Sequence, residues 1–463
     1  MSNRPRRSTL ATAFNPRRNS FGFLRITMAL AVFVQHGLIA GGFVGAPRAS
    51  SRFDLAAIAV DCFFAISGFL VTRSRLSIRW TARFLWHRFL RILPGFWLCL
   101  VVVAMVIAPL GWQHQHGTLS GYFGARPHGP FAYVLTNSTL LMHFYDIAGT
   151  PRGVPITALP NGPVAWDGSL WSLFWEALCY LGLAALGAGG RLRRRTRLLT
   201  VLTGLLSGLW VLRWLCPGSL PTLLDSDLAG AAVRLGSMFL AGALLCVYAD
   251  RVPYNRRLGP VAIVAATAAI LLLPDAHAPA SLPIAYSCVW LAIRLPLHRI
   301  GARNDLSYGT YIYSAPVQQL LAVYGLHRAG IVPYFAVSLA GTVMLAAVSW
   351  RLLEQPALRR KNQVVPGLAR LRFVLRRTGG RRAAARPRVV PAAVPRQRDV
   401  PHAQSPHARL DGARDGGVVV GEQQQSEQDH QEQAGPVRRE HRQADRPEQA
   451  QHGDRRGEPP LLR

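Results

Sequence analysis

Long apolar runs constrain this chain most, because they recur from residue 21 to residue 353. The first extends from Phe21 to Phe43, and about 20 helical residues suffice to cross a bilayer. Helices that satisfy their own backbone hydrogen bonds are the usual way to span a membrane with such runs. We therefore expect an all-α, polytopic membrane protein with about ten transmembrane helices. The further runs lie near 54–72, 92–110, 168–188, 198–216, 228–248, 258–273, 281–293, 306–324 and 334–353.

The basic residues lie mainly between these runs. The chain has 53 Lys and Arg against 23 Asp and Glu, an excess that raises nucleic acid as a partner. The recurring apolar runs argue against nucleic acid and for a membrane. With the N-terminus inside and the spans alternating, the inside segments carry roughly five times as many Lys and Arg as the outside segments. We expect both termini to be cytoplasmic.

Three regions follow from this pattern. Residues 1–20 form a cytoplasmic N-terminal segment, and residues 21–362 form a transmembrane domain. Within that domain, the shorter apolar piece at 131–145 is compatible with either a re-entrant or an interfacial segment. Residues 363–463 are rich in Arg, Gln, Pro, Ala and Glu, and we expect this basic and polar tail to be disordered. It could bind anionic lipid, or it could lack a role and even come from a reading-frame error.

The first run carries two ionisable residues, Arg25 and His36. Ionisable groups inside a spanning helix are costly and usually mark function. Eleven residues at ~100° each make three turns plus ~20°, so both side chains project from one face, ~16 Å apart along the axis. The alternative is a snorkelling arginine and a histidine bonded to a neighbouring helix.

Two acidic residues in other runs are predicted at a similar depth to His36. With the expected topology, His36 and Asp61 lie ~10 Å and Glu176 ~12 Å below the outer surface. A carboxylate beside an imidazole fixes its tautomer and raises its basicity, as a general base requires. We therefore interpret His36, Asp61 and Glu176 as catalytic candidates. A purely structural network between helices is the alternative.

A second cluster is predicted at the cytoplasmic side. Arg88 and Arg91 are three residues apart, so they share a helix face where the third helix leaves the cytoplasm. With Arg25 they could form an anion site suited to bidentate phosphate contacts. Positive-inside anchoring explains a basic loop equally well, but it does not explain why Arg88 and Arg91 share one helix face.

Several motifs occur in a fixed order. They are R-x10-H at Arg25 and His36, VDCFFAISGFLVTRS at 60–74, HRFLRILPGFW at 87–97, GSLWSLFWEALCYL at 168–181, DLSYGTYIYSAPVQQLL at 305–321 and WRLLEQPALR at 350–359. Together they resemble the acyltransferase-3 family of integral-membrane acyl-CoA-dependent O-acyltransferases, over residues 20–362. The chain departs from this family at Ser314, where many members carry His in a Y-x-x-H-x-P stretch.

The resemblance implies acyl transfer from cytoplasmic acyl-CoA, and acetyl-CoA in the simplest case, to a hydroxyl of a carbohydrate or glycosylated metabolite. His36 would be the catalytic base, Asp61 or Glu176 would orient its imidazole, and the three arginines would hold the donor. Acyl-CoA would be a co-substrate, with no tightly bound cofactor and no nucleic-acid partner. The transmembrane acyltransferase domain would contact membrane lipids in a bacterial plasma membrane. The alternative function is a proton-coupled transporter or flippase of a glycan or lipid, with His36, Asp61 and Glu176 as a proton relay.

Other chemistries find little support. The sequence has no H-x4-D motif and no G-x-S-x-G serine elbow. The six cysteines lie in or at the ends of apolar runs without a C-x-x-C pair, so neither zinc nor disulfides are expected. His114 and His116 lie in an outer loop without nearby ligands, and we predict no metal site there.

Overall fold

The computed structural model divides the chain into two units, residues 1–386 and 387–463. It describes residues 8–45, 54–158, 164–190, 192–216, 221–222, 226–273, 277–302 and 304–362, all of which belong to the first unit. Over these ranges the fold is helical and has no strands, only isolated bridges. The predicted tail at 363–463 lies outside the described residues.

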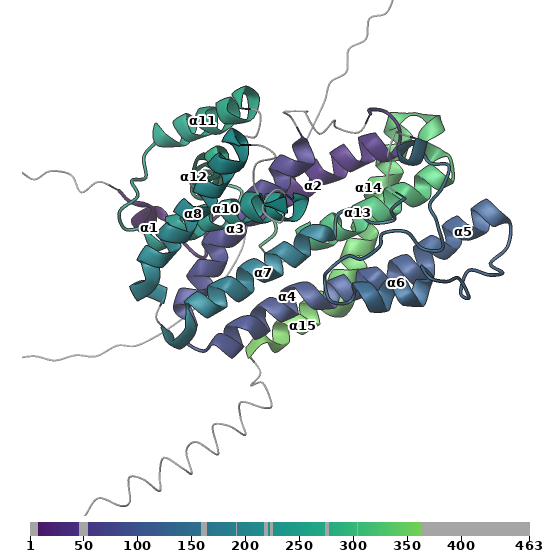
Figure 1. Ribbon diagram of the computed structural model, residues 1–463, viewed down its shortest axis with the longest axis horizontal. Helices are drawn as coiled ribbons and strands as arrows, with labels where there is room; N and C mark the ends of the chain where they lie inside the picture. Colours follow the sequence, from purple (N-terminus) through teal and green to yellow (C-terminus); the bar gives the residue numbers. More distant parts are fainter. Residues whose placement is uncertain are drawn as a thin grey trace, which may run out of the picture. The chain divides into compact units, whose positions relative to one another are not determined.

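Each predicted apolar run coincides with a helix of the structure (Figure 1). A π-helical segment, Val103–Ile107, joins α4 (Thr81–Val102) to α5 (Ala108–His116), and another, Trp350–Glu354, joins α14 (Ile331–Ser349) to α15 (Gln355–Arg359). The helices are α1 Leu10–Ala13, α2 Phe21–Ala40, α3 Leu55–Ser77, α4 Thr81–Val102, α5 Ala108–His116, α6 Pro130–Asn137, α7 Trp171–Leu186, α8 Thr196–Leu215, α10 Asp227–Val247, α11 Leu258–Leu272, α12 His277–Arg294, α13 Ser307–Val323, α14 Ile331–Ser349 and α15 Gln355–Arg359.

Six helical stretches of the described chain are long and apolar enough to cross a membrane. Two further apolar helices, α7 and α11, are shorter. The protein is therefore a multi-pass membrane protein by the length and composition of its helices, whereas the count of ten spans stays a prediction. The six stretches are Phe21–Ala40, Leu55–Ser77, Thr81–His116, Thr196–Leu215, Asp227–Val247 and Ile331–Arg359.

Local sequence explains where some of these helices begin and end. The Asp54 carboxylate accepts a hydrogen bond from the Ala57 amide at 2.8 Å, which caps α3 at its first turn. Helix α5 ends at Gly117, whose φ of 74° suits a residue without a side chain. The piece at 131–145 forms only α6, which is eight residues long and too short to span a bilayer.

Helix α3 packs against α10 and α2, and α2 packs in turn against α13. Helices α3 and α10 cross closely, because a Cβ added at Gly68 or at Gly242 would lie 2.0 Å from a backbone oxygen of the other helix. Small residues allow such close backbone approach in membrane bundles. Helix α13 is buried along most of its length, between α2 and α14.

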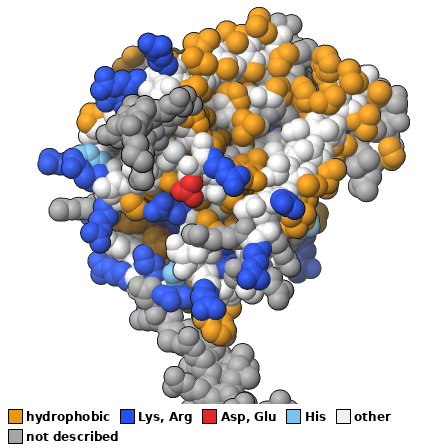
Figure 2. Space-filling model, turned by 90° about the vertical axis from the view of Figure 1, so that its left-hand side faces the viewer, with side chains coloured by type: hydrophobic (Ala, Val, Ile, Leu, Met, Phe, Trp, Pro, Cys, Tyr) orange, Lys and Arg blue, Asp and Glu red, His pale blue; other side chains and the backbone are white. Residues whose placement is uncertain are grey.

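The N-terminal segment is tied to the end of α10. The Leu10 amide donates to the Val252 carbonyl at 3.0 Å, and the Tyr254 amide donates to the Ser8 carbonyl at 2.8 Å. Figure 2 views the molecule from the left-hand side of Figure 1, where α1 lies. In this view Lys and Arg side chains gather on the left and in the lower half, whereas hydrophobic side chains cover the upper right.

Candidate active site

Arg25 and Arg91 converge on one carboxylate at the start of α13. Arg25 Nη1 lies 2.5 Å and Arg91 Nη2 lies 2.7 Å from Asp305 Oδ2. Burial would raise the pKa of Asp305, but the two guanidinium groups and the Ser307 hydrogen bonds together hold it well below its usual value. Asp305 is therefore ionised at neutral pH and joins α2 and α4 to α13.

Arg88 has a different environment from the other two predicted arginines. Its guanidinium lies over the ring of Tyr180 on α7, 5.7 Å from the ring centroid. Its Nε atom is buried and finds no hydrogen-bond partner among the described residues. The structure thus brings Arg25 and Arg91 together at Asp305 and places Arg88 against α7.

A small cavity of about 50 Å³ begins at Arg25 and lies between α2, α3, α7 and α13. Tyr311 and Phe63 also line this cavity. The centroids of their rings are 5.8 Å apart. Its lining consists of Arg25, Val60, Phe63, Phe64, Ser67, Ser172, Leu173, Glu176, Ser307, Tyr308 and Tyr311.

His36 lies near the other end of α2, against the segment that precedes α7. Its Nδ1 atom is 3.3 Å from the Ser169 hydroxyl. The start of α3 is close by, since the Gln35 side chain accepts from the Leu55 amide at 3.1 Å and Asp54 acts electrostatically on His36. The imidazole is half-buried.

Tyr311 links the cavity to the segment beside His36. Its hydroxyl donates to the Ser169 carbonyl at 2.9 Å and lies 2.7 Å from the Ser172 hydroxyl. Since Tyr311 and Ser172 both line the cavity, only Ser169 stands between this hydrogen-bonded pair and His36. The arginine end and the histidine end of α2 are thus connected through one set of side chains.

Asp61 pairs with an arginine of α10. Its carboxylate is 1% exposed and accepts from Arg234 Nε at 2.9 Å. The same guanidinium donates to the Ala57 carbonyl at 2.7 Å. This buried ion pair fastens α10 to α3, and removing either partner would leave a charge without compensation.

Glu176 lies at a different level of the bundle from Asp61. Its carboxylate accepts from the Ser67 hydroxyl at 2.9 Å and from the Tyr180 hydroxyl. Ser67 is six residues beyond Asp61 on α3, so this contact is ~9 Å deeper along the helix. The three titratable groups therefore do not share one layer: Glu176 lies on the wall of the cavity, and His36 lies near the start of α3.

The sequence analysis did not identify two ion-pair partners of the predicted residues, Arg234 and Asp305. Arg234 lies inside the apolar run at 228–248, so the rule that singled out Arg25 would also have found it. Asp305 lies in the DLSYGTYIYSAPVQQLL motif, but no pattern in the sequence indicates that it faces two arginines. His114 and His116, predicted to lie in a loop, belong to the last turn of α5 and stack on separate rings, His114 on Tyr324 and His116 on Trp112.

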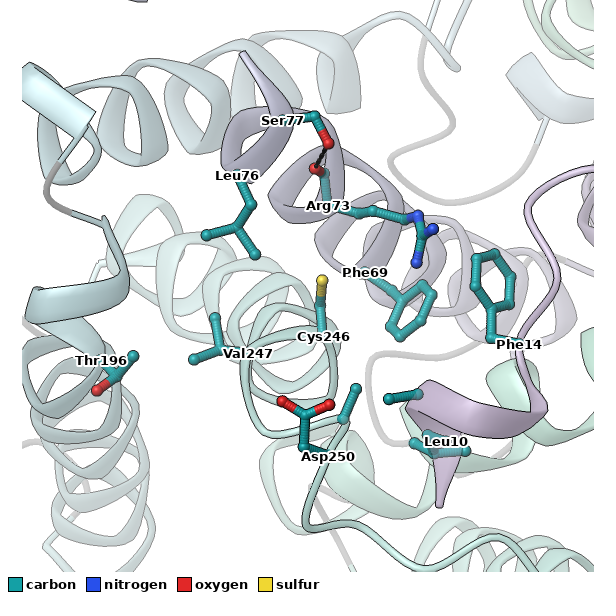
Figure 3. Close-up of a pocket in the computed structure, with 12 residues that line it drawn as sticks. Leu10, Phe14, Phe69, Arg73, Leu76, Ser77, Thr196, Cys246, Val247 and Asp250 are labelled. Carbon is teal, nitrogen blue, oxygen red and sulfur yellow. Dashed lines mark hydrogen bonds between the residues drawn. The ribbon is translucent and has the colours of Figure 1, made fainter. Parts of the chain in front are cut away.

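A larger pocket of about 460 Å³ lies between α1, α3, α8 and α10 (Figure 3). In Figure 3 the Arg73 guanidinium lies over the Phe14 ring, at 4.7 Å from its centroid, and Cys246 and Asp250 complete the wall. Phe69 and Arg73 point roughly 200° away from the α3 residues of the small cavity, at ~100° per residue. The two pockets thus open on opposite faces of α3 and share no lining residue.

Comparison of the sequence with known proteins identifies a family. The family profile described as "Acyltransferase domain" (Acyl_transf_3) matches residues 18–352. No solved structure matches the chain.

Three curated relatives cover most of the chain. Nodulation protein 10 of Rhizobium leguminosarum bv. viciae is 29% identical over 75% of this chain and 95% of its own length. An O-acetyl transferase of Shigella phage Sf6 is 26% identical over 75% of this chain and 98% of its own. The exopolysaccharide production protein ExoZ of Rhizobium meliloti (strain 1021) is 27% identical over 71% and 98%, respectively. With the family profile covering well over half of its length, the chain belongs to the acyltransferase-3 family and is an acyltransferase.

Proposed function

We propose that this protein is an integral-membrane O-acyltransferase that moves an acetyl group from acetyl-CoA to a hydroxyl of a carbohydrate or glycosylated metabolite. The names of two relatives support the chemistry and the acceptor, since one is an O-acetyl transferase and another acts in exopolysaccharide production. The single observation that carries the proposal is the cavity that leads from Arg25 to Tyr311, beside the segment that contacts His36.

The arginine end suits the phosphate groups of acyl-CoA. Asp305 compensates part of the charge of Arg25 and Arg91 and fixes both guanidinium groups, each of which keeps further N–H donors. Arg88 Nε is a buried donor without a partner among the described residues, which an anionic ligand would satisfy. We assign all three arginines to the donor, with Arg88 as the direct phosphate contact.

The histidine end suits the reacting hydroxyl. His36 would accept the hydroxyl proton while the hydroxyl oxygen attacks the thioester carbonyl carbon. The carbon–sulfur bond then breaks, and the departing thiolate takes the proton from the imidazolium. Such general-base help is typically worth ~10²–10⁴ in rate. Glu176 would contribute to catalysis from the wall of the cavity. Asp61 would contribute indirectly, through its ion pair with Arg234.

The name of one relative supports a short acyl chain. Since that relative is an O-acetyl transferase, we propose acetyl-CoA as the donor.

We further propose ten transmembrane spans, with both termini in the cytoplasm of a bacterial cell and the domain in its plasma membrane. The helices at all ten predicted positions and the basic face in Figure 2 support this topology. It places Arg25 and Arg88 at the side where acyl-CoA is made and His36 toward the outside.

Thioester consumption by the purified protein tests the function. We expect release of free thiol from acetyl-CoA that depends on an added glycan acceptor and is lost in His36→Ala. A transporter or flippase would move its cargo across liposome membranes without consuming thioester, and that result would refute the proposal.

A further inference from the structure

The pocket of Figure 3 lies where three apolar helices begin or end. Ser77 is the last residue of α3, Val247 is the last residue of α10 and Thr196 is the first residue of α8, and all three line the pocket. Each of these helices is long and apolar enough to cross a membrane. A pocket at their ends therefore lies at the level of the lipid headgroups.

Two oppositely charged side chains line this pocket. Figure 3 shows that Arg73 reaches it from α3 and Asp250 from the segment that follows α10. Both residues are exposed, and within the described ranges neither of them belongs to an ion pair. A ligand that carries one anionic and one cationic group would complement both charges.

The Arg73 guanidinium suits a phosphate group. Its carbon lies over the Phe14 ring, 4.7 Å from the centroid, so the ring covers one face of the planar group. The Ser77 hydroxyl donates to the Arg73 carbonyl at 3.1 Å, and no described residue accepts a hydrogen bond from the guanidinium itself. The N–H donors at the edge of the guanidinium plane match two oxygens of a phosphate.

The Asp250 carboxylate suits a primary ammonium group. An ionised carboxylate only accepts hydrogen bonds, and a primary ammonium offers three N–H donors. Phosphatidylethanolamine carries both groups, because two carbons join its phosphate to its ammonium. Its headgroup lies at the level of this pocket, and its acyl chains extend from there into the apolar part of the membrane.

An apolar groove of about 250 Å³ lies beside this pocket along α8 and α10, and α7 forms its third side. Its lining residues are all Leu, Phe, Trp, Ala, Gly or Cys. On α8 it begins at Leu199, about one turn after Thr196 of the pocket. On α10, Phe239 of the groove and Cys246 of the pocket are seven residues apart, so they share one helix face. The groove thus offers a hydrocarbon chain a place next to the charged pocket.

We propose that the pocket and the groove together bind one molecule of phosphatidylethanolamine. Its phosphate contacts Arg73, its ammonium contacts Asp250 and one acyl chain lies in the groove. Because Leu10 and Phe14 also line the pocket, the bound lipid joins the N-terminal segment to the spanning helices. The site shares no lining residue with the small cavity, so it is independent of the proposed function.

Native mass spectrometry of the full-length protein tests this site. The protein in detergent is titrated with phosphatidylethanolamine, phosphatidylglycerol and phosphatidylcholine of identical acyl chains. We expect phosphatidylethanolamine to bind most tightly, because phosphatidylglycerol lacks the ammonium and the quaternary ammonium of phosphatidylcholine has no N–H donor.

Two substitutions should change this preference in different ways. Arg73→Gln should weaken phosphatidylethanolamine and phosphatidylglycerol alike, by about tenfold, as expected for loss of a charged hydrogen bond. Asp250→Asn should bring the two lipids to similar affinity, because the carboxylate no longer attracts the ammonium. Arg79→Gln and Asp227→Asn are the matched controls, since these exposed residues do not line the pocket, and both should keep the wild-type preference.

A third substitution tests the groove. Gly182 lines it, and a Cβ at this position meets nothing within 4 Å, so Gly182→Leu fills the groove without a clash at Cβ. It should weaken phosphatidylethanolamine binding severalfold. Gly204→Leu is the matched control, because Gly204 is equally exposed and unobstructed but does not line the groove.

The outcomes also identify the source of the headgroup. Glycerophosphoethanolamine, which has the headgroup without the chains, should not displace the lipid at equal concentration. Displacement by it would overturn the lipid assignment in favour of a soluble ligand, and displacement by acetyl-CoA would assign the pocket to the acyl donor instead. Equal affinity of the wild type for all three lipids, or an unchanged lipid preference in Asp250→Asn, would also overturn the proposal. Both comparisons are made between lipids within one preparation, so a partly misfolded variant does not imitate them.

Discussion

At the scale of single residues, the two ionisable groups of α2 contact different parts of the protein. Arg25 bonds to Asp305 at one end, and His36 contacts Ser169 at the other. Substitutions at the two positions should therefore affect different steps of the reaction.

His36→Ala should abolish turnover and leave acetyl-CoA affinity nearly unchanged, because the donor phosphates would lie ~16 Å away near Arg25.

Arg25→Ala should weaken donor binding, and more so when Arg88 is also removed, since cations that share one anion couple non-additively. Turnover and acetyl-CoA affinity, measured on variants of matched abundance, check both. Near wild-type acylation by well-folded His36→Ala would contradict the assignment.

Phe63 should limit the length of the acyl chain, because its ring faces that of Tyr311 at the wall of a cavity of about 50 Å³. Phe63→Ala should raise activity with propionyl- and butyryl-CoA relative to acetyl-CoA. Phe174→Ala removes an equally half-buried ring of α7 that does not line the cavity, and it should keep the wild-type preference. Unchanged chain preference in Phe63→Ala would mean that the acyl group binds elsewhere.

Only part of the candidate site could be read from the sequence. Arg25 and His36 were chosen as candidates because an ionisable residue in an apolar run is itself a signal, and their roles stay predictions. Ser169 and Asp305 were not, because their roles depend on contacts across 133 and 280 positions of the chain. A serine or an aspartate at a helix start is ordinary until its neighbours from other helices are known.

At the scale of elements, hydropathy located the helices, and close packing decides how they fit. The length of the apolar runs predicted the helices. It did not indicate that α13 is buried between α2 and α14, or that α3 and α10 cross at glycines. Those facts depend on side-chain size at particular positions, which hydropathy does not measure.

Gly242→Ala should destabilise the bundle by about 1–3 kcal/mol, the usual cost of overpacking. Its Cβ would lie 2.0 Å from the Ala65 carbonyl oxygen, so α3 would have to move away from α10. Gly204→Ala on α8 is the control, because a Cβ there meets nothing within 4 Å and alanine favours helix over glycine. Thermal unfolding in detergent should show a lower midpoint for the first variant and an equal or higher one for the second. Equal midpoints for both would argue against the close crossing.

At the scale of the whole molecule, the alternation of basic segments predicts the orientation in the membrane. A reporter fused after Gly149 should read as extracytoplasmic, and one fused after Arg194 as cytoplasmic, because α7 lies between them. Both reporters on one side of the membrane would mean that α7, with only 16 residues, does not span.

The burial of α13 has a consequence for biosynthesis. This helix carries Gln318 and Gln319 in its buried surface, and Gln318 Nε2 donates to the Phe33 carbonyl of α2 at 2.8 Å. Tyr334 of α14 in turn donates to the Gln318 carbonyl. A helix with amides on its surface gains little by leaving the translocon alone. Of its two partners, α2 is made before α13 and α14 after it. We therefore expect α13 to reach its final packing only after α14 has been synthesised.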